Sequence, residues 1–239
     1  MEPLTSVQDL IQYATRRYFT EPRGRWIFRG HSKAEYDLVP SVGRYKHTAK
    51  SRQRYEKGLF DIFRREALAY IAPGPDNDWE WLSLAQHHGL PTRMLDWTYN
   101  PLVGLYFAIH ANEGSDGRLF ALRAARSSSE HALPESPFEI DRPVKLFPNI
   151  ITPRIRAQEG VFVVCQELER PLDQVLPTSW KVEQHLIKAE NKPALRYELF
   201  RLGVHSSSLF PDLDGLSARL KWQHEVLPLV PDQEPALKQ

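Results

Sequence analysis

The side chains best able to do chemistry are gathered in residues 86–98, which read Gln-His-His-Gly-Leu-Pro-Thr-Arg-Met-Leu-Asp-Trp-Thr. This stretch supplies imidazoles, a guanidinium, a carboxylate and hydroxyls, from His87, His88, Thr92, Arg93, Asp96 and Thr98. Such groups bind charged ligands or transfer protons when they are held in a fixed arrangement. The stretch therefore predicts a binding or catalytic site, provided that the elements around it are rigid.

The elements around this stretch should be two helices joined by a short strand. Gly89 is the type of residue that follows the end of a helix, and Pro91 prevents the helix from resuming. Asn100 and Pro101 are typical of an N-cap and a first helical residue, so a second helix should begin there. Residues 92–97 can form a short strand between them. This frame would hold the polar side chains in place.

The adjacent histidines invite a metal site, but the sequence around them does not favour one. His87 and His88 come at the end of a helix and should point in different directions, and no Asp, Glu or Cys set stands at a recognised ligand spacing. We therefore expect no metal. A helix C-terminus favours the imidazolium form, so His88 can instead donate hydrogen bonds to an anion.

Asp96 and Thr98 each have a structural and a functional interpretation. Asp96 has apolar neighbours in the sequence, and a buried carboxylate without a partner is too costly, so some partner must exist. The partner could be Arg93 or nearby backbone amides, or Asp96 could act on a ligand. Thr98 is either a turn hydroxyl or a ligand contact. The sequence leaves both choices open.

The composition is that of a globular protein large enough to bury a substantial core. The chain has 239 residues, of which 41% are hydrophobic and 26% charged. No apolar run approaches the length of a membrane span, and the start, Met-Glu-Pro-Leu, lacks a signal pattern. The single cysteine, Cys165, excludes an intrachain disulfide and lies in an apolar run, where we expect it to be inert. We expect a cytoplasmic protein without a membrane partner.

The net charge is only +1, but the positive residues are unevenly spread. Eleven Lys and Arg residues fall between positions 16 and 54, against three acidic residues. Such a run is either a solvated surface or a surface for the phosphates of a dinucleotide or a nucleic acid. The predicted nucleic-acid contacts are Lys46, Lys50, Arg52 and Arg54.

The hydrophobic periodicity predicts helices and strands mixed along the chain. Helices are expected over residues 5–18, 53–71, 79–88, from 101 onward, 192–202 and 212–222. Strands are expected over residues 25–30, 92–97, 118–123, 161–165 and 182–189, whereas residues 36–44 and 124–143 should be irregular. Helices dominate the N-terminal half, so the predicted fold class is α+β.

A single mixed domain accounts for this pattern. We expect an N-terminal helix over residues 1–20 that packs on a domain spanning residues 21–225. Residues 226–239 contain three prolines and should form a frayed tail.

Several motifs in this order resemble the FRG domain family, which is named for a phenylalanine-arginine-glycine signature. The signature is Phe28-Arg29-Gly30, and residues 86–98 resemble the family's central block, with Asn100-Pro101 and Leu105-Tyr106-Phe107-Ala108 in the helix that follows. Two further blocks resemble the family, Ala157-Gln158-Glu159-Gly160-Val161-Phe162 and Leu209-Phe210-Pro211-Asp212-Leu213-Asp214-Gly215-Leu216. The similarity runs from about Trp26 to Leu220, so residues 21–225 are identified as the FRG domain.

The resemblance implies an activity, because the family is similar to bacterial toxins and phage-defence effectors and to the arginine–serine–glutamate class of ADP-ribosyltransferases. In that class, an arginine-glycine on an early strand holds the phosphates of NAD, and Arg29-Gly30 fits this element. Asp96-Trp97-Thr98 takes the place of a serine-threonine-serine element but departs from it. Gln158-Glu159 is the best match for the catalytic glutamate. The implied fold has a split, ADP-ribosyltransferase-like β core.

The predicted site residues follow from this resemblance together with the residues themselves. The catalytic candidates are Glu159, Gln158 and Asp96. The candidates for binding NAD are Arg29, Gly30, His88, Arg93 and Thr98. Arg29 could otherwise be a strand arginine paired with a carboxylate, but an arginine before a glycine can also bind a pyrophosphate bidentately.

Our leading hypothesis is a NAD-dependent mono-ADP-ribosyltransferase that needs no metal and modifies RNA or DNA, as a toxin or phage-defence effector. It could instead modify a protein. A different hypothesis is a non-enzymatic nucleic-acid-binding module that uses the basic run with Trp26, Phe28, Tyr36 and Tyr45. A metal-dependent nuclease is disfavoured because one strong carboxylate candidate accompanies the histidines. The acceptor, the oligomeric state and an antitoxin or other masking partner stay open.

Overall fold

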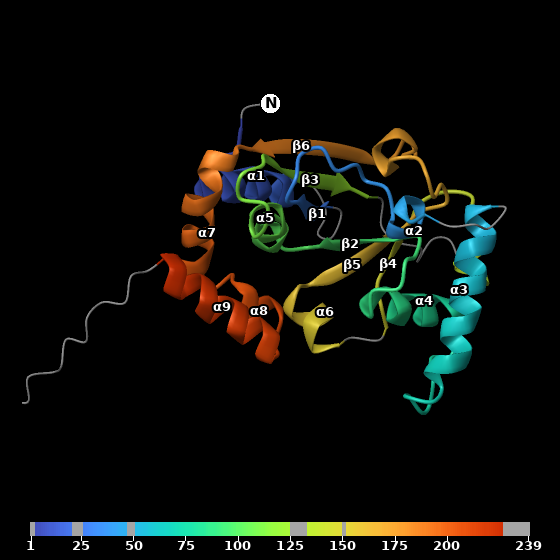
Figure 1. Cartoon of the computed structure of the whole chain (residues 1–239). Coiled ribbons are helices and arrows are strands. Elements are labelled where there is room, and N and C mark those ends of the chain that lie inside the picture. The colour runs from blue at the N-terminus through green and yellow to red at the C-terminus, as the bar shows by residue number, and fades with distance from the viewer. Residues whose placement is uncertain (1–2, 21–25, 47–50, 125–132, 150–151, 227–239) are drawn as a thin grey trace, which may run out of the picture.

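The computed structural model describes residues 3–20, 26–46, 51–124, 133–149 and 152–226 (Figure 1). These residues form a six-stranded antiparallel sheet with helices around it, so the predicted α+β class is confirmed. The strands are β1 (Trp26–His31), β2 (Met94–Thr98), β3 (Gly117–Arg123), β4 (Val144–Leu146), β5 (Gly160–Val164) and β6 (Lys181–Ile187). Their order across the sheet is β4-β5-β2-β1-β3-β6.

The helices of the described part differ widely in length. The α-helices are α1 (Val7–Thr20), α2 (Ser41–Arg44), α3 (Arg52–Ala67), α4 (Asp78–His87), α5 (Pro101–Ile109), α6 (Pro153–Ala157), α7 (Lys192–Arg201), α8 (Ser206–Leu209) and α9 (Leu213–Val226). The 3₁₀ turns are η1 (Pro137–Glu139), η2 (Leu172–Gln174) and η3 (Ala189–Asn191).

The sheet opens between its two central strands. β1 pairs with β3 at six register positions, and β2 pairs with β5 at five. Between β1 and β2, both of which are fully described, the register consists of the single pair Phe28–Thr98. The sheet therefore behaves as two half-sheets, β1-β3-β6 and β2-β5-β4, which touch at one point and diverge beyond it.

Each half-sheet has its own hydrophobic core, and a third core joins them. Figure 1 shows α1, α5 and α7 beside β1, β3 and β6, and α3 and α4 beside β4 and β5. The first core includes Leu10, Phe28 and Leu105. The second surrounds Phe60, between α3, α4 and the strands β2, β4 and β5. The joining core contains Ile27 and other apolar residues of β1, β2, β3 and β5. Because each half-sheet has its own core, the two can separate at one end of the sheet while both remain folded.

Helix α5 packs closely against β1 because glycines remove the side chains between them. A Cβ atom on Gly30 would lie 2.2 Å from the Gly104 carbonyl oxygen and 2.3 Å from the Ala108 nitrogen. A Cβ atom on Gly104 would lie 2.8 Å from Phe28 Cβ. Gly30 therefore allows the backbone of α5 to approach β1 closely.

Most predicted elements are present, and those that were missed are short. The expected helix over residues 53–71 ends at Ala67, and residues 36–44, expected to be irregular, include α2. The strand β4 was not predicted because its three residues gain their structure from pairing with β5. Helices α6 and α8, of five and four residues, were also missed. The expected tail lies outside the described residues from 227 onward.

We predict that Gly30→Ala lowers the free energy of unfolding by about 3 kcal/mol or more, because the added methyl meets backbone atoms that cannot rotate away. Denaturant unfolding followed by circular dichroism would measure the change. Gly58→Ala is the matched control, because no atom lies within 4 Å of a Cβ added there in the exposed interior of α3. It should raise stability by about 0.5–1 kcal/mol. Equal stability of the two variants would contradict the packing argument.

Candidate functional site

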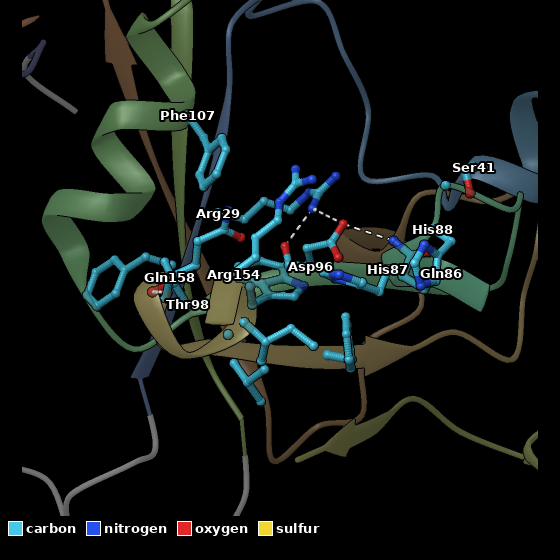
Figure 2. Close-up of a pocket in the computed structure, with 18 of the residues that line it drawn as sticks. Arg29, Ser41, Gln86, His87, His88, Asp96, Thr98, Phe107, Arg154 and Gln158 are labelled. Carbon is cyan, nitrogen blue, oxygen red and sulfur yellow. Dashed lines mark hydrogen bonds and ion pairs between the residues drawn. The ribbon is translucent and has the colours of Figure 1, made fainter. Parts of the chain in front are cut away.

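A cavity of about 700 Å³ occupies the opening between β1 and β2 (Figure 2). Its walls come from β1, β2, β5, α5, α6, the end of α4 and Ser41 of α2. The polar side chains that line it include Arg29, Gln86, His87, His88, Asp96, Thr98, Arg154 and Gln158. Five of these belong to the stretch 86–98, so the fold places the chemically richest segment at the opening of the sheet.

Arg29 and Asp96 face each other across this opening. Arg29 Nη1 donates to the Asp96 carbonyl oxygen at 2.5 Å and lies 3.7 Å from the carboxylate oxygen Oδ2. The Asp96 side chain is 60% exposed although the other four residues of β2 are buried, whereas the Arg29 side chain is 18% exposed. An exposed carboxylate in the middle of a buried strand is therefore directed into the cavity, where a ligand can reach it.

A chain of hydrogen bonds fixes the Asp96 carboxylate. Gln86 Nε2 donates to Asp96 Oδ2 at 2.9 Å, as the dashed line in Figure 2 shows. Gln86 Oε1 in turn accepts from the Thr92 hydroxyl at 2.6 Å, and the Thr92 oxygen accepts from Met94 N at 3.0 Å. The amide of Gln86 can therefore hold one orientation only, which directs its NH₂ group toward Asp96.

His31 fixes the Arg29 guanidinium from the other side. Arg29 Nε donates to His31 Nε2 at 3.0 Å, and His31 Nδ1 lies 3.0 Å from the Tyr36 carbonyl oxygen. This pattern assigns the proton to Nδ1 in a neutral imidazole. Burial, followed by the charge of Arg29, lowers the pKa of His31 to about 3. At neutral pH His31 therefore adds no charge and orients the guanidinium.

A second guanidinium lines the cavity, and the sequence analysis missed it. Arg154 stands on α6, with its Cζ atom 4.4 Å from the ring centroid of Phe210. Figure 2 shows its side chain extending into the same space as that of Arg29. Thr152 caps α6 and Pro153 is its first residue, and this cap-and-proline pair could have predicted the helix. The cavity thus has two cations able to bind phosphate oxygens.

Residues 24–117 match the family model of the FRG domain. This match supports the resemblance of these residues to the FRG family. It covers both central strands, α4 and α5, and so includes Arg29, Gln86 and Asp96, whereas α6 and β5 lie beyond it. Neither the search of curated proteins nor that of solved structures found a match. No helix in the described ranges is long and apolar enough to span a bilayer.

His87 and His88 line the cavity, with their ring centroids 5.1 Å apart. Burial is the main cause that lowers the pKa of His87, and the neighbouring His88 and Arg154 lower it further. In the described part of the chain, no group of three or more His, Cys, Asp or Glu residues is placed to hold a metal ion. His88 is exposed at the end of α4 and lines the same cavity as Arg29 and Arg154.

Thr98 and Gln158 also line the cavity, but each has a partner within the protein. The Thr98 hydroxyl donates to the Gln158 carbonyl oxygen at 2.7 Å and accepts from Asn100 N at 3.0 Å. Gln158 Nε2 donates to the Leu209 carbonyl oxygen at 3.1 Å. These residues link β2 to α6 and α8 and form part of the cavity wall.

Glu159, predicted as a catalytic carboxylate, does not line the cavity. Its side chain is exposed and accepts from Asn100 Nδ2 at 3.0 Å, while Asn100 caps α5. Its backbone is left-handed, with φ 48°, which directs the chain away at the turn between α6 and β5. Of the described residues that line the cavity, Asp96 supplies the one carboxylate. Asp96 is therefore a better placed catalytic candidate than Glu159.

Arg93, predicted to bind the cofactor, lies in the core instead. Its guanidinium forms a bidentate pair with Glu56, with Nη2 2.7 Å from Oε2, and the two side chains are 3% and 1% exposed. Glu56 also accepts from the Arg93 backbone nitrogen at 2.9 Å, and Arg93 Nη1 donates to the Pro137 carbonyl oxygen at 3.1 Å. This pair fastens β2 to α3. Arg93 is therefore not the partner of Asp96, whose carboxylate faces Arg29 instead.

The four predicted nucleic-acid contacts have different environments. Lys46 and Arg54 are exposed. Arg52 is held within the protein, because it donates to Glu169 at 2.8 Å and to the carbonyl oxygens of Val42 and Tyr45. Lys50 lies outside the described residues. Lys46 and Arg54 are therefore the members of this set that the structure shows to be available to a polyanion.

A second cavity, of about 340 Å³, adjoins the first. The two share Arg29, Gly30 and Phe107, and the second extends along the loop after β1 toward Arg44 and His110. Arg29 thus stands at the junction of two cavities, with Asp96 on one side only.

We predict that His31 makes the folded protein less stable as the pH falls below about 6.5. The folded state keeps His31 neutral down to pH about 3, whereas the unfolded state binds a proton near pH 6.5, so stability rises with pH between these values. The contribution approaches about 1.4 kcal/mol per pH unit within this window. Unfolding free energies between pH 5 and 7 would measure it, and His31→Gln should flatten the slope by this amount. Parallel slopes for the variant and the unchanged chain would show that His31 is protonated in the folded state.

Proposed function

We propose that this FRG domain is a NAD-dependent mono-ADP-ribosyltransferase that modifies RNA or DNA. The observation that carries the proposal is the place of Arg29, at the junction of two cavities and beside a carboxylate. A dinucleotide has the matching shape, with a central pyrophosphate and a nucleoside on either side. The split of the sheet between β1 and β2 agrees with the ADP-ribosyltransferase-like core that the FRG resemblance implies.

The two arginines fit the pyrophosphate. His31 and the Asp96 carbonyl oxygen occupy Arg29 Nε and Nη1, which leaves Nη2 without a hydrogen-bond partner among the described residues. Arg154 enters from the opposite wall, and the two guanidiniums can each bind phosphate oxygens bidentately. No metal is required for this binding, because the charge of the phosphates is met by side chains.

Asp96 fits the chemical step. When the bond between nicotinamide and ribose breaks, its electron pair leaves with the neutral nicotinamide and the ribose C1′ becomes positive. A carboxylate fixed by Gln86 and directed into the cavity stabilises this developing charge without moving. The nucleophile of the acceptor then bonds to C1′ and loses its proton to Asp96 or to water. Glu159 has no role in this scheme, because its carboxylate is bound to Asn100 outside the cavity.

A nucleic-acid acceptor is favoured over a protein by the exposed cations. Lys46 and Arg54 lie near either end of the segment that joins α2 to α3, and Ser41 of α2 lines the larger cavity. Positive charge near the cavity steers a polyanion toward bound NAD, which a protein acceptor would not require. The FRG resemblance further supports a role as a toxin or phage-defence effector, in which an antitoxin or other protein would mask the mouth of the cavity.

A binding module without catalysis is the second candidate, and the basic surface residues favour it. It would bind nucleic acid with an affinity that falls steeply with salt and is indifferent to NAD. The exposed and oriented carboxylate of Asp96 argues against it, since this negative charge stands 3.7 Å from Arg29 and would compete with a phosphate backbone for the guanidinium.

We predict that Arg29→Ala weakens NAD binding about 10- to 100-fold, because the variant loses a charge-assisted bidentate contact. Asp96→Asn should bind NAD nearly as well as the unchanged chain and release nicotinamide about 10²- to 10³-fold more slowly. Calorimetry would measure binding, and chromatography would measure nicotinamide release in the presence of RNA and DNA. Lys221→Ala, at an exposed position of α9 that lines neither cavity, is the control. The absence of NAD binding by the folded, unchanged chain would refute the proposed enzyme.

We predict that reversing two exposed cations, Lys46→Glu with Arg54→Glu, cripples modification of the nucleic acid at physiological salt and leaves NAD binding nearly intact. Arg52 is spared because it holds Glu169 and two backbone carbonyls. The same change of charge at Arg201 and Lys221, on the distant helices α7 and α9, is the control. Transfer of labelled ADP-ribose would be measured over a range of salt concentrations. Undiminished transfer by the Lys46 and Arg54 variant would show that these two side chains are only solvated and do not bind the nucleic acid.

A further inference from the structure

The second cavity has walls of a different chemical character from those of the first. It is lined by the loop after β1, by Arg44 of α2 and by Phe107 and His110 at the end of α5. The loop contributes an aromatic ring, Tyr36, and two carboxylates, Glu35 and Asp37. A flat aromatic side chain that is 43% exposed at a cavity offers a face on which a planar ring can stack.

The loop that carries Tyr36 is held firmly in place. Lys192, which is 1% exposed, donates from Nζ to the Ser32 carbonyl oxygen at 2.7 Å and to the Asn112 carbonyl oxygen at 2.9 Å. Ala34 N donates to the Asp116 carbonyl oxygen at 2.6 Å, and His31 binds the Tyr36 carbonyl oxygen. The wall of the second cavity is thus built before any ligand arrives, which lowers the entropic cost of binding.

The acidic residues of the loop offer partners to a nucleoside. The carboxylates of Asp37 and Glu35, the latter 3.6 Å from Lys33, accept hydrogen bonds from ribose hydroxyls and from the amino group of a base. A nucleoside attached to a phosphate at Arg29 therefore meets suitable partners there.

The first cavity suits the reacting end of the ligand. It contains Asp96, and at about 700 Å³ it has room for the nicotinamide riboside and for the attacking group of an acceptor. The second, at about 340 Å³, has room for a nucleoside alone. Asp96 does not line it.

We infer that the second cavity is the binding site for the adenosine end of the dinucleotide, with its base against Tyr36 and its ribose facing Asp37 and Glu35. The inference rests on the proposed function, since it assigns the orientation of the same ligand about Arg29. Tyr36 is then a specificity-determining residue for the base, and it takes no part in breaking the glycosidic bond.

The two halves of NAD test this orientation separately. Adenosine monophosphate and nicotinamide mononucleotide each carry one nucleoside and a phosphate, and calorimetry would give the affinity of each. Tyr36→Ala should weaken the binding of adenosine monophosphate about 5- to 100-fold and leave that of nicotinamide mononucleotide unchanged. Tyr36→Phe should bind both like the unchanged chain, since it keeps the ring. Arg29→Ala should weaken both, because both phosphates use the same anchor.

The control is Tyr70→Ala, which removes a tyrosine that is 88% exposed and lines neither cavity. The inference is overturned if Tyr36→Ala leaves the binding of adenosine monophosphate unchanged or weakens nicotinamide mononucleotide instead. It is also overturned if the unchanged chain does not bind adenosine monophosphate. In any of these cases, release of nicotinamide from NAD would show that the proposed function stands without this orientation, and its absence would show that both fail.

Discussion

The contact between Arg29 and Asp96 joins two strands at the place where their backbones separate. The guanidinium on β1 reaches the carbonyl oxygen of Asp96 on β2 and stands 3.7 Å from its carboxylate. A sheet closed by backbone hydrogen bonds would leave no space here, and a wider opening would break the contact between Arg29 and Asp96. The single register pair Phe28–Thr98 and this side-chain contact keep the opening at a width that a ligand can fill.

The opening is stable because each of its walls is anchored away from it. The buried pair of Glu56 and Arg93 fastens β2 to α3, and α5 packs on β1 through a contact that Gly30 permits. A buried ion pair is costly to desolvate, but it makes the position of a strand specific when all of its hydrogen bonds are satisfied. Here it holds β2 so that Asp96 is exposed between buried neighbours.

The proposed function and the inferred orientation of the dinucleotide both rest on the asymmetry about Arg29. One side has a carboxylate fixed by Gln86 and a second guanidinium, Arg154, which suits charge development and phosphate binding. The other side has an aromatic ring and hydrogen-bond acceptors on a rigid loop, which suits recognition without reaction. His31 lines the second cavity and connects the two sides, because it orients Arg29 and donates to the carbonyl oxygen of Tyr36.

The sequence by itself determined the α+β class, most of the long elements and the stretch that contains the site, because periodicity and capping signals are local. It also pointed to Arg29, Asp96 and Thr98, which line the cavity. It could not place Arg93 or Glu159, since burial with Glu56 and the turn before β5 depend on contacts between distant segments. Only the tertiary structure brought Arg154 to the cavity and made Arg29, and not Arg93, the partner of Asp96. The physical reason is that a charged side chain takes the partner that packing brings near, which the order of residues along the chain does not specify.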